Sequence, residues 1–191
     1  MIDLALVNPN NRTPAPFAAI EPPLWLGLIA GYNLAQGKSV AVVDAEAEGL
    51  TIEQTAQRVN DLHPEEAIIV VMGTNPSVSS TPKMPIAQEL LKHVDAKLAG
   101  LHPMALGYPN TIYQPFEGYP CVPWHLLPRD KYRAHNWHCF DDLEQRSPYG
   151  VLYTSLNCSF TCHYCNIHTL YGNRRMLWRP MADIESELIY F

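Results

Sequence analysis

The first half of the chain alternates short apolar segments with longer amphipathic ones. The apolar segments are Leu4–Val7, Ser39–Val43, Ala67–Met72 and Ala96–Ala99, and polar or turn-forming residues follow each of them. Segments this short and this apolar, Ala67–Met72 above all, are typical of strands covered on both faces. The alternation predicts strand–helix–strand units around a parallel sheet, and therefore an α/β fold.

Three helices are expected between these strands. Prolines precede the first, Leu24–Leu34, and Gly37 follows it; the small Gly27 and Gly31 would let this helix lie close to the sheet. Thr51 and Gln54 form a capping-box pattern at the start of the second, which ends at His63-Pro64. The third is expected over residues 82–94.

The loops that follow the strands are candidates for a ligand site. In an open parallel sheet, ligands bind in the crevice outside the carboxyl ends of the strands. The loops that begin at Asn8, Asp44, Gly73 and Gly100 are therefore expected to converge at one edge. Topology alone fits a set of simple turns equally well, so the ligand site is a hypothesis at this point.

The composition changes after the fourth strand. Residues 107–147 are rich in proline and aromatic side chains and show little periodicity, which predicts a linker that packs against the rest. Gly150–Leu156 then predicts a strand, and Asp183–Ile189 the start of a helix. These changes predict three parts: residues 1–106, 107–147 and 148–191.

Three cysteines follow the strand expected at Gly150–Leu156. Cys158, Cys162 and Cys165 form a C-x3-C-x2-C array, which places three thiolates on one short loop, close enough to share one metal centre. They fill three of the four positions of an iron–sulfur cubane or of a tetrahedral zinc ion. A ligand from outside the protein could take the fourth position, and an open metal position usually means reactivity.

The residues alone leave other metal centres open. His168 lies three residues after Cys165 and could complete a Cys3His zinc site, and His163 is another candidate within the loop. An electron-transfer cluster could instead take His168 or Cys139 as its fourth ligand. Either alternative would make the chain a non-catalytic metal protein that uses its α/β part as an interaction module. Cys121 and Cys139 are otherwise expected to be ordinary linker cysteines.

Composition excludes several classes of partner. The 191 residues carry thirteen basic and nineteen acidic side chains, a formal net charge of −6, without a Lys/Arg cluster, so nucleic acid is not an expected partner. The start of the chain lacks a basic signal-peptide region, and the longest apolar segment is too short to span a membrane. Closely spaced thiols fit metal binding in a reducing compartment. We therefore expect a cytoplasmic protein.

The cysteine loop, directly after a strand and with Phe160 and Tyr164 beside the thiols, resembles that of the radical S-adenosylmethionine (radical SAM) superfamily. The resemblance implies that the thiolates hold a 4Fe-4S cluster whose fourth iron binds the amino and carboxylate groups of S-adenosylmethionine. It places Tyr164 beside the adenine. A fourth cysteine would block the contact through which the cluster passes an electron to the sulfonium. A reductant such as flavodoxin or ferredoxin is implied as well.

The front half is similar to the cobalamin-binding domain of cobalamin-dependent radical enzymes. The similar segments, in order, are Glu21–Leu28, Val42–Ala45, the Ser/Thr-rich loop after the third strand, Gly100–Leu106, and Pro123–Pro128, which resembles the segment joining the two domains. The resemblance implies a bound cobalamin. The residues it places near the corrin or its nucleotide tail are Thr74, Asn75, Ser77, Gly100 and His102.

The chain departs from the family pattern in two places. The loop Asn8–Phe17 contains no histidine, so the Asp-x-His-x-x-Gly cobalt ligand of many cobalamin mutases and methyltransferases is absent. Between Leu106 and Pro123 only a short stretch stands where the family has another strand and helix, so the sheet is expected to lack an edge. Because the sequence ends at the start of the first barrel helix, the resemblance also suggests a fragment or a truncated product.

The resemblance as a whole implies a Rossmann-like parallel-sheet cobalamin-binding domain, followed by the first strand, loop and helix of a radical SAM partial (β/α) barrel. A complete enzyme of this kind would form a 5′-deoxyadenosyl radical, abstract hydrogen from an unactivated carbon and transfer a methyl group from methylcobalamin. Other members use the same parts for cyclisation or rearrangement. The substrate, a small molecule or a peptide, is not specified by these residues, and the truncated chain alone is expected to be inactive.

Overall fold

Four parallel strands form the main sheet of the computed structural model, which describes residues 1–11, 19–72, 83–111, 120–135, 139, 142–165 and 167–190. The strands are β1 (Ile2–Asn8), β2 (Val40–Asp44), β3 (Pro64–Val70) and β4 (Lys97–Ala99), in the spatial order β2-β1-β3-β4. In the register of the sheet, Leu4 of β1 lies between Val40 and Glu66. The predicted parallel α/β fold is confirmed, and the strand order changes direction at β1 and β3, where such sheets bind ligands.

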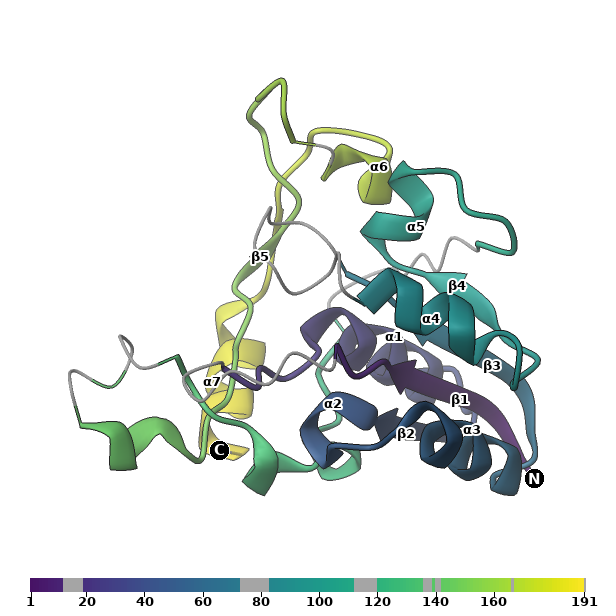
Figure 1. Cartoon of the computed structure of the whole chain (residues 1–191). Coiled ribbons are helices and arrows are strands. Elements are labelled where there is room, and N and C mark those ends of the chain that lie inside the picture. The colour runs from purple at the N-terminus through teal and green to yellow at the C-terminus, as the bar shows by residue number, and fades with distance from the viewer. Residues whose placement is uncertain are drawn as a thin grey trace.

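Apolar layers cover both faces of the sheet (Figure 1). Leu4 and Leu6 pack beneath α1 (Leu24–Ala35), whereas Ala5 and Val7 pack on the other face beneath α3 (Ile52–Asp61) and α4 (Lys83–Leu90). This division follows from the two-residue period of a strand, which sends successive side chains to opposite faces. No helix in the described part of the chain has the length and apolar character needed to cross a membrane.

Local capping explains where α3 begins. The predicted capping box of α3 is present: Gln54 N–H donates to Thr51 Oγ1 at 3.2 Å, and Thr51 N–H donates to Gln54 Oε1 at 2.9 Å. Two short helices, α2 (Ala45–Glu48) and α5 (Leu101–Ala105), were not predicted. Each has at most five residues, so neither carries enough turns to show a helical period.

The two glycines of α1 face the linker. A Cβ atom on Gly31 would lie 1.9 Å from the carbonyl oxygen of Cys121, and one on Gly27 would lie 2.8 Å from Cγ1 of Val122. The expectation that these glycines bring α1 close to the sheet is therefore wrong. They instead let the backbone of Cys121 and the side chain of Val122 lie directly on the helix, an approach that a larger residue would prevent.

The described part of the linker belongs to the core. Trp124 in the 3₁₀ turn η1 (Trp124–Leu126) is 1% exposed, and Tyr132, just after η2 (Arg129–Lys131), is 0% exposed. Both lie in the apolar layer on the α1 side. A further 3₁₀ turn, η4 (Leu143–Arg146), follows. The linker packs as predicted, whereas the limits of the three parts stay predictions.

The far edge of the sheet carries only a trace of a fifth strand. Thr111 forms a single parallel bridge with Leu98 of β4, and Leu98 N–H donates to the carbonyl of Asn110 at 3.0 Å. Within the described ranges, no named strand lies beyond β4. Residues 112–119 lie outside the described residues, so the expectation that the sheet lacks an edge stays a prediction.

The last part of the chain contains a small two-stranded sheet. The elements of this part are β5 (Ser155–Leu156), α6 (His168–Tyr171), β6 (Leu177–Trp178) and α7 (Met181–Tyr190). The small sheet consists of β5 and β6, which pair antiparallel. The predicted helix from Asp183 is confirmed by α7. The strand expected at Gly150–Leu156 is wrong for its first five residues. A strand needs a partner for its backbone groups, and the partner described here, β6, is only two residues long.

A buried ion pair connects α7 and β6 to the linker. The side chains of Arg179 and Glu187 are 0% and 4% exposed and form a salt bridge. Glu187 also accepts from Trp124 Nε1–H at 2.7 Å, and the Arg179 guanidinium lies 4.7 Å from the centre of the Tyr153 ring. Tyr153 O–H donates to the carbonyl of Pro120 at 2.8 Å. The ion pair sets each buried charge against the opposite one, although Arg179 Nε has no hydrogen-bond partner among the described residues.

Substitution of the two α1 glycines distinguishes a backbone clash from a side-chain clash. Gly31→Ala is expected to lower the free energy of unfolding by about 1–3 kcal/mol, because the Cys121 carbonyl must move. Gly27→Ala should change it by less than about 1 kcal/mol, since Val122 can rotate and alanine favours the helix. Urea unfolding measures both. Equal stability of Gly31→Ala and the wild type would contradict the close contact between helix and linker.

Candidate functional site

The carboxyl ends of the parallel strands form the candidate ligand edge. At this edge β1 ends with Asn8, β2 ends with Asp44, and β4 is followed by Gly100. Of the residues predicted to contact cobalamin, Gly100 and His102 lie here, at the start of α5. Thr74, Asn75 and Ser77 lie outside the described residues.

Gly100 lets the ends of β3 and β4 approach each other closely. Its φ is +108°, and a Cβ atom there would lie 2.3 Å from the carbonyl oxygen of Val71. His102 N–H donates to the same carbonyl at 3.4 Å. Only glycine satisfies both the conformation and the space, so the backbone itself forms this part of the edge.

His102 is half-buried beside Tyr108, with ring centres 6.2 Å apart. Burial lowers the pKa of His102 below its ordinary value of 6.5. The imidazole is therefore neutral at pH 7 and can donate from one nitrogen and accept at the other. At this edge it offers hydrogen bonding without charge.

A buried polar network fills the β2–β1 side of the edge. Asp44 is 0% exposed and accepts from Asn8 Nδ2–H at 2.7 Å, from Ala47 N–H at 3.1 Å and from Tyr132 O–H at 2.7 Å. Lys83 Nζ donates to Asn8 Oδ1 at 3.0 Å and to Glu46 Oε2 at 2.6 Å. The network joins the linker to the sheet.

Sequence reasoning placed Asn8 and Asp44 only at the starts of loops and missed this network. The available signal was a polar residue at the end of each of two apolar strands. Burial raises the pKa of Asp44 above its ordinary 3.8, although the bonds from Tyr132, Ala47 and Asn8 oppose that rise. Burial and the nearby Asp44 carboxylate also raise the pKa of Tyr132.

The three cysteines lie on one loop between β5 and α6, as predicted. Cys158 and Cys165 are half-buried and Cys162 is exposed, and none forms a disulfide. Cys165 N–H donates to the Cys162 carbonyl at 3.2 Å, which closes a turn. Across the described residues, no group of three or more Cys, His, Asp or Glu side chains has metal-binding geometry. The convergence of the three thiols on one metal centre therefore stays a prediction.

The donor set nevertheless fits a soft metal centre. Three accessible thiols on one short segment are the ligands that iron–sulfur clusters and zinc prefer. Tyr164 and Phe160 beside them are 88% and 71% exposed. A hydrogen bond to Cys162, together with the charge of that thiolate, raises the pKa of Tyr164.

His168 is engaged by the backbone. Its Nε2 lies 2.8 Å from the carbonyl oxygen of Phe160, and its Nδ1 lies 3.2 Å from that of Asn173. Both ring nitrogens therefore face backbone oxygens. Ligation by His168 would need the ring to turn away from at least one of them, which disfavours the Cys3His alternative.

The remaining candidate ligands lie elsewhere or in solvent. Figure 1 shows the segment that contains η4, which follows Cys139, at the opposite end of the molecule from the cysteine loop. Cys139 itself is buried, whereas His163 is exposed. Cys139 is thus not placed as a fourth ligand.

Helix α6 holds the cysteine loop beside the ligand edge. Figure 1 shows α6 next to α5, and the two helices are in contact. The ring of Tyr171 in α6 meets that of Trp25 in α1 edge to face, with centres 5.9 Å apart and an interplanar angle of 87°. The loop is therefore fixed near the β4–α5 end of the sheet.

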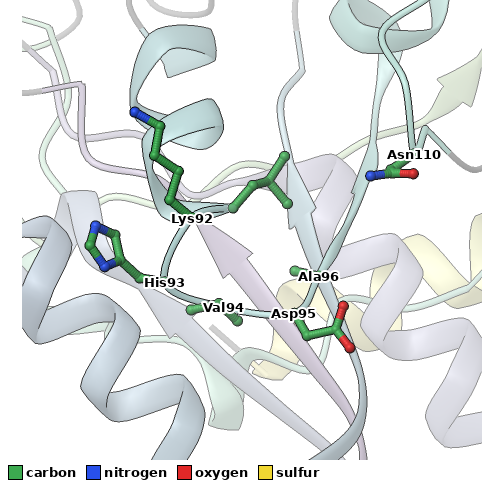
Figure 2. A pocket seen from close by; sticks show the side chains of 7 residues that line it. Lys92, His93, Val94, Asp95, Ala96 and Asn110 are labelled. Atoms are coloured by element: carbon green, nitrogen blue, oxygen red, sulfur yellow. The ribbon is translucent and has the colours of Figure 1, made fainter.

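A polar depression of about 410 Å³ lies away from this site. Residues 91–96 and Asn110 line it, and Ala96 directly precedes β4, so it lies at the amino end of that strand. Figure 2 shows the side chains of Lys92, His93 and Asp95 spread around the depression rather than converging. It is not part of the candidate site.

Comparison with known proteins gives consistent relatives. No family model matches the chain. The chain is 26% identical to the uncharacterized methyltransferase PH0819 of Pyrococcus horikoshii in an alignment 212 positions long, gaps included. The alignment covers 83% of this chain and 42% of that protein. The chain thus spans less than half of that relative.

Similar solved structures come from two enzymes. TsrM, a radical S-adenosylmethionine methyltransferase from Kitasatospora setae with bound cobalamin and [4Fe-4S] cluster, matches with a TM-score of 0.57 and 14% identity, over 98% of this chain and 45% of that one. TsrM with tryptophan and a SAM analogue matches with a TM-score of 0.58, 16% identity and the same coverage. The cobalamin-dependent radical enzyme OxsB, with aqua-cobalamin and S-adenosylmethionine bound, matches with a TM-score of 0.53 and 14% identity, over 100% of this chain and 32% of that one.

The chain shares its fold with cobalamin-dependent radical SAM enzymes. The parallel sheet matches a Rossmann-like cobalamin-binding domain, as predicted. Identities of 14–16% support a shared fold and leave the activity to be proposed.

The Asp44–Tyr132 bond makes a testable contribution to stability. Tyr132→Phe leaves a buried carboxylate oxygen without this donor and should lower the free energy of unfolding by about 1–3 kcal/mol at neutral pH. Asp44→Asn is the matched variant, since its amide can donate to the Tyr132 oxygen and still accept from Asn8. Asp44→Asn should lower the free energy of unfolding by less than Tyr132→Phe does.

The pH dependence of stability follows from the raised pKa of Asp44. Such a group favours the folded state below its unfolded pKa, and this contribution is lost as pH rises through the folded pKa. Tyr132→Phe raises the folded pKa of Asp44 further, so the loss of stability with rising pH should extend over a wider pH range above the ordinary Asp pKa. Asp44→Asn should flatten the curve. Identical urea-unfolding profiles for all three proteins would contradict the network.

Proposed function

We propose that this chain provides the cobalamin-binding domain and the cluster-binding loop of a radical SAM enzyme that transfers a methyl group to an unactivated carbon. The observation that carries the proposal is the packing of α6 against α5 and Trp25, which keeps the cysteine loop next to the carboxyl edge of the sheet. Both proposed cofactor sites then face one region of the molecule.

The roles of the individual residues follow from their chemistry. Cys158, Cys162 and Cys165 would hold three irons of a 4Fe-4S cluster, and Tyr164 would contact the adenine of S-adenosylmethionine. Gly100 and His102, with Thr74, Asn75 and Ser77, would contact cobalamin. When bound, the cluster supplies the electron that cleaves S-adenosylmethionine, and cobalamin supplies the methyl group.

The surroundings of the loop support S-adenosylmethionine as the fourth ligand over a protein side chain. The ring nitrogens of His168 face carbonyl oxygens, and His163 is exposed. A three-thiolate site keeps one iron for an external ligand, which zinc in a structural site does not require. The exposed Phe160 and Tyr164 leave the loop accessible to a reductant such as flavodoxin or ferredoxin.

The ligand edge supports cobalamin on the β3–β4 side. The Asp44 network occupies the β2–β1 side with satisfied hydrogen bonds. On the other side, Gly100 brings the ends of β3 and β4 together, and the neutral His102 beside it can bond to a ligand. Methyl transfer is preferred to cyclisation because two of the similar proteins, PH0819 and TsrM, are named methyltransferases.

Cluster binding is tested by anaerobic reconstitution with iron and sulfide. The wild type should become brown, hold about four irons per chain and change its spectrum when S-adenosylmethionine is added. Cys158→Ala, Cys162→Ala and Cys165→Ala should each lose most of this iron. Cys121→Ala and Cys139→Ala are the matched controls and should keep it. A colourless, zinc-loaded protein, or a cluster indifferent to S-adenosylmethionine, would overturn the proposal.

Cobalamin binding is tested at Gly100. Gly100→Ala forces the Val71 carbonyl away and should weaken hydroxocobalamin binding by at least about tenfold, or about 1.4 kcal/mol. Gly107→Ala is the matched control, since Gly107 also has a positive φ but no atom within 4 Å of an added Cβ. Absorbance titration measures both. Failure of the wild type to bind, or equal binding by Gly100→Ala, would contradict this assignment.

A further inference from the structure

We infer that Asn157, His168 and Asn173 are positioning residues that hold the cysteine loop in shape before a cluster binds. The inference rests on the proposed role of Cys158, Cys162 and Cys165 as cluster ligands. The three positioning residues make no contact with the reacting groups and act through the loop backbone. They were not predicted from the sequence, where only His168 was considered, and then as a metal ligand.

The cysteine loop leaves the small sheet after β5 and returns to it at β6, and we call the place where these two chain segments lie side by side the neck of the loop. Leu156 of β5 pairs with Leu177 of β6, so the segment between them is an excursion that starts at Asn157 and ends just before β6. This excursion contains all three cysteines and α6. Whatever fixes the neck therefore limits the conformations of the whole cysteine loop.

Asn157 joins the two sides of the neck. Its backbone has φ of +69°, and its Oδ1 accepts from Cys158 N–H at 2.8 Å. Its Nδ2 donates across the neck to the carbonyls of Asn173 at 3.0 Å and Arg175 at 2.9 Å. One side chain thus orients the first cysteine and ties it to the returning chain.

His168 joins the middle of the loop to the same point. It contacts the carbonyl of Phe160, between the first two cysteines, at 2.8 Å and the carbonyl of Asn173 at 3.2 Å. The Asn173 carbonyl therefore bonds both Asn157 and His168. These contacts connect positions before, within and after the C-x3-C-x2-C array.

Asn173 keeps its own turn in place. Its Oδ1 accepts from Arg175 N–H at 2.8 Å, and its Nδ2 donates to the Tyr171 carbonyl at 2.9 Å. The shared carbonyl is thereby held where Asn157 and His168 reach it. A loop ordered in advance binds a ligand more tightly, because less conformational freedom is lost on binding.

Variants at Asn157 separate the side-chain bonds from the backbone conformation. Asn157→Gly tolerates the positive φ but removes every side-chain hydrogen bond. Asn157→Ala removes these hydrogen bonds and also disfavours the positive φ. Asn157→Asp keeps the acceptor for Cys158 but turns an oxygen toward two carbonyls. His168→Leu removes both ring contacts, and Asn173→Ala keeps the shared carbonyl. Ser159→Ala, at an exposed loop serine, is the matched control.

The measurement is the rate at which a chelator removes iron from the reconstituted protein. Asn157→Asp and His168→Leu should lose iron about tenfold to a hundredfold faster than the wild type, as outer-shell partners of metal ligands do. Asn157→Gly should also lose iron faster, Asn173→Ala less so, and Ser159→Ala at the wild-type rate. Thermal unfolding of the apo-proteins should differ little, since these residues lie outside both apolar cores.

Hydrogen exchange of the apo-protein gives a readout that needs no cluster. The peptide from Cys158 to Tyr171 should exchange faster in Asn157→Asp and His168→Leu than in the wild type. If the wild type takes up no cluster, the proposed function fails, while hydrogen exchange still tests whether the positioning residues order the loop. If the wild type binds a cluster and S-adenosylmethionine, but these variants match it in iron loss and exchange, the positioning role alone is overturned. Wild-type behaviour of Asn157→Gly would likewise overturn the role of its side chain.

Discussion

The contact between Gly31 and the Cys121 carbonyl governs how the two halves of the chain meet. Because α1 has no side chain at this point, the linker lies on the helix surface and carries Trp124 and Tyr132 into the core. Tyr132 then reaches Asp44 at the ligand edge, and Trp124 reaches Glu187 of α7. The positions of both candidate cofactor sites therefore depend on the surface of α1 at Gly31, where the helix has no side chain.

Buried charge reinforces this arrangement with directional contacts. Arg179 and Glu187 are almost fully removed from solvent, and each is bound by the other and by neutral partners on the linker side. Removing either partner would leave an uncompensated charge, so the pair tolerates few alternative packings. Such pairs fix relative orientation more than they add stability, which suits the proposal that two cofactor sites lie side by side.

The fold was largely predictable because its strands are short and apolar, and because Thr51 and Gln54 mark a helix start. Local spacing also places Cys158, Cys162 and Cys165 on one loop, whereas their binding of one metal centre stays a prediction. The Asp44–Tyr132 and Asn157–Asn173 hydrogen bonds join residues that are not neighbours in the sequence. The pattern of apolar and polar residues does not predict such bonds. Gly27 and Gly31 were recognised as a close-packing surface, but a one-dimensional pattern could not tell which neighbour would use it.

The border strand β4 has a consequence for self-association. An unpaired strand can template pairing with another molecule, and proteins counter this with short borders and lysine. Here β4 has three residues, Thr111 occupies part of its outer side, and Lys97 is held by Glu66 at 2.7 Å. Among the described residues, this border strand therefore presents little free backbone to which another copy could pair.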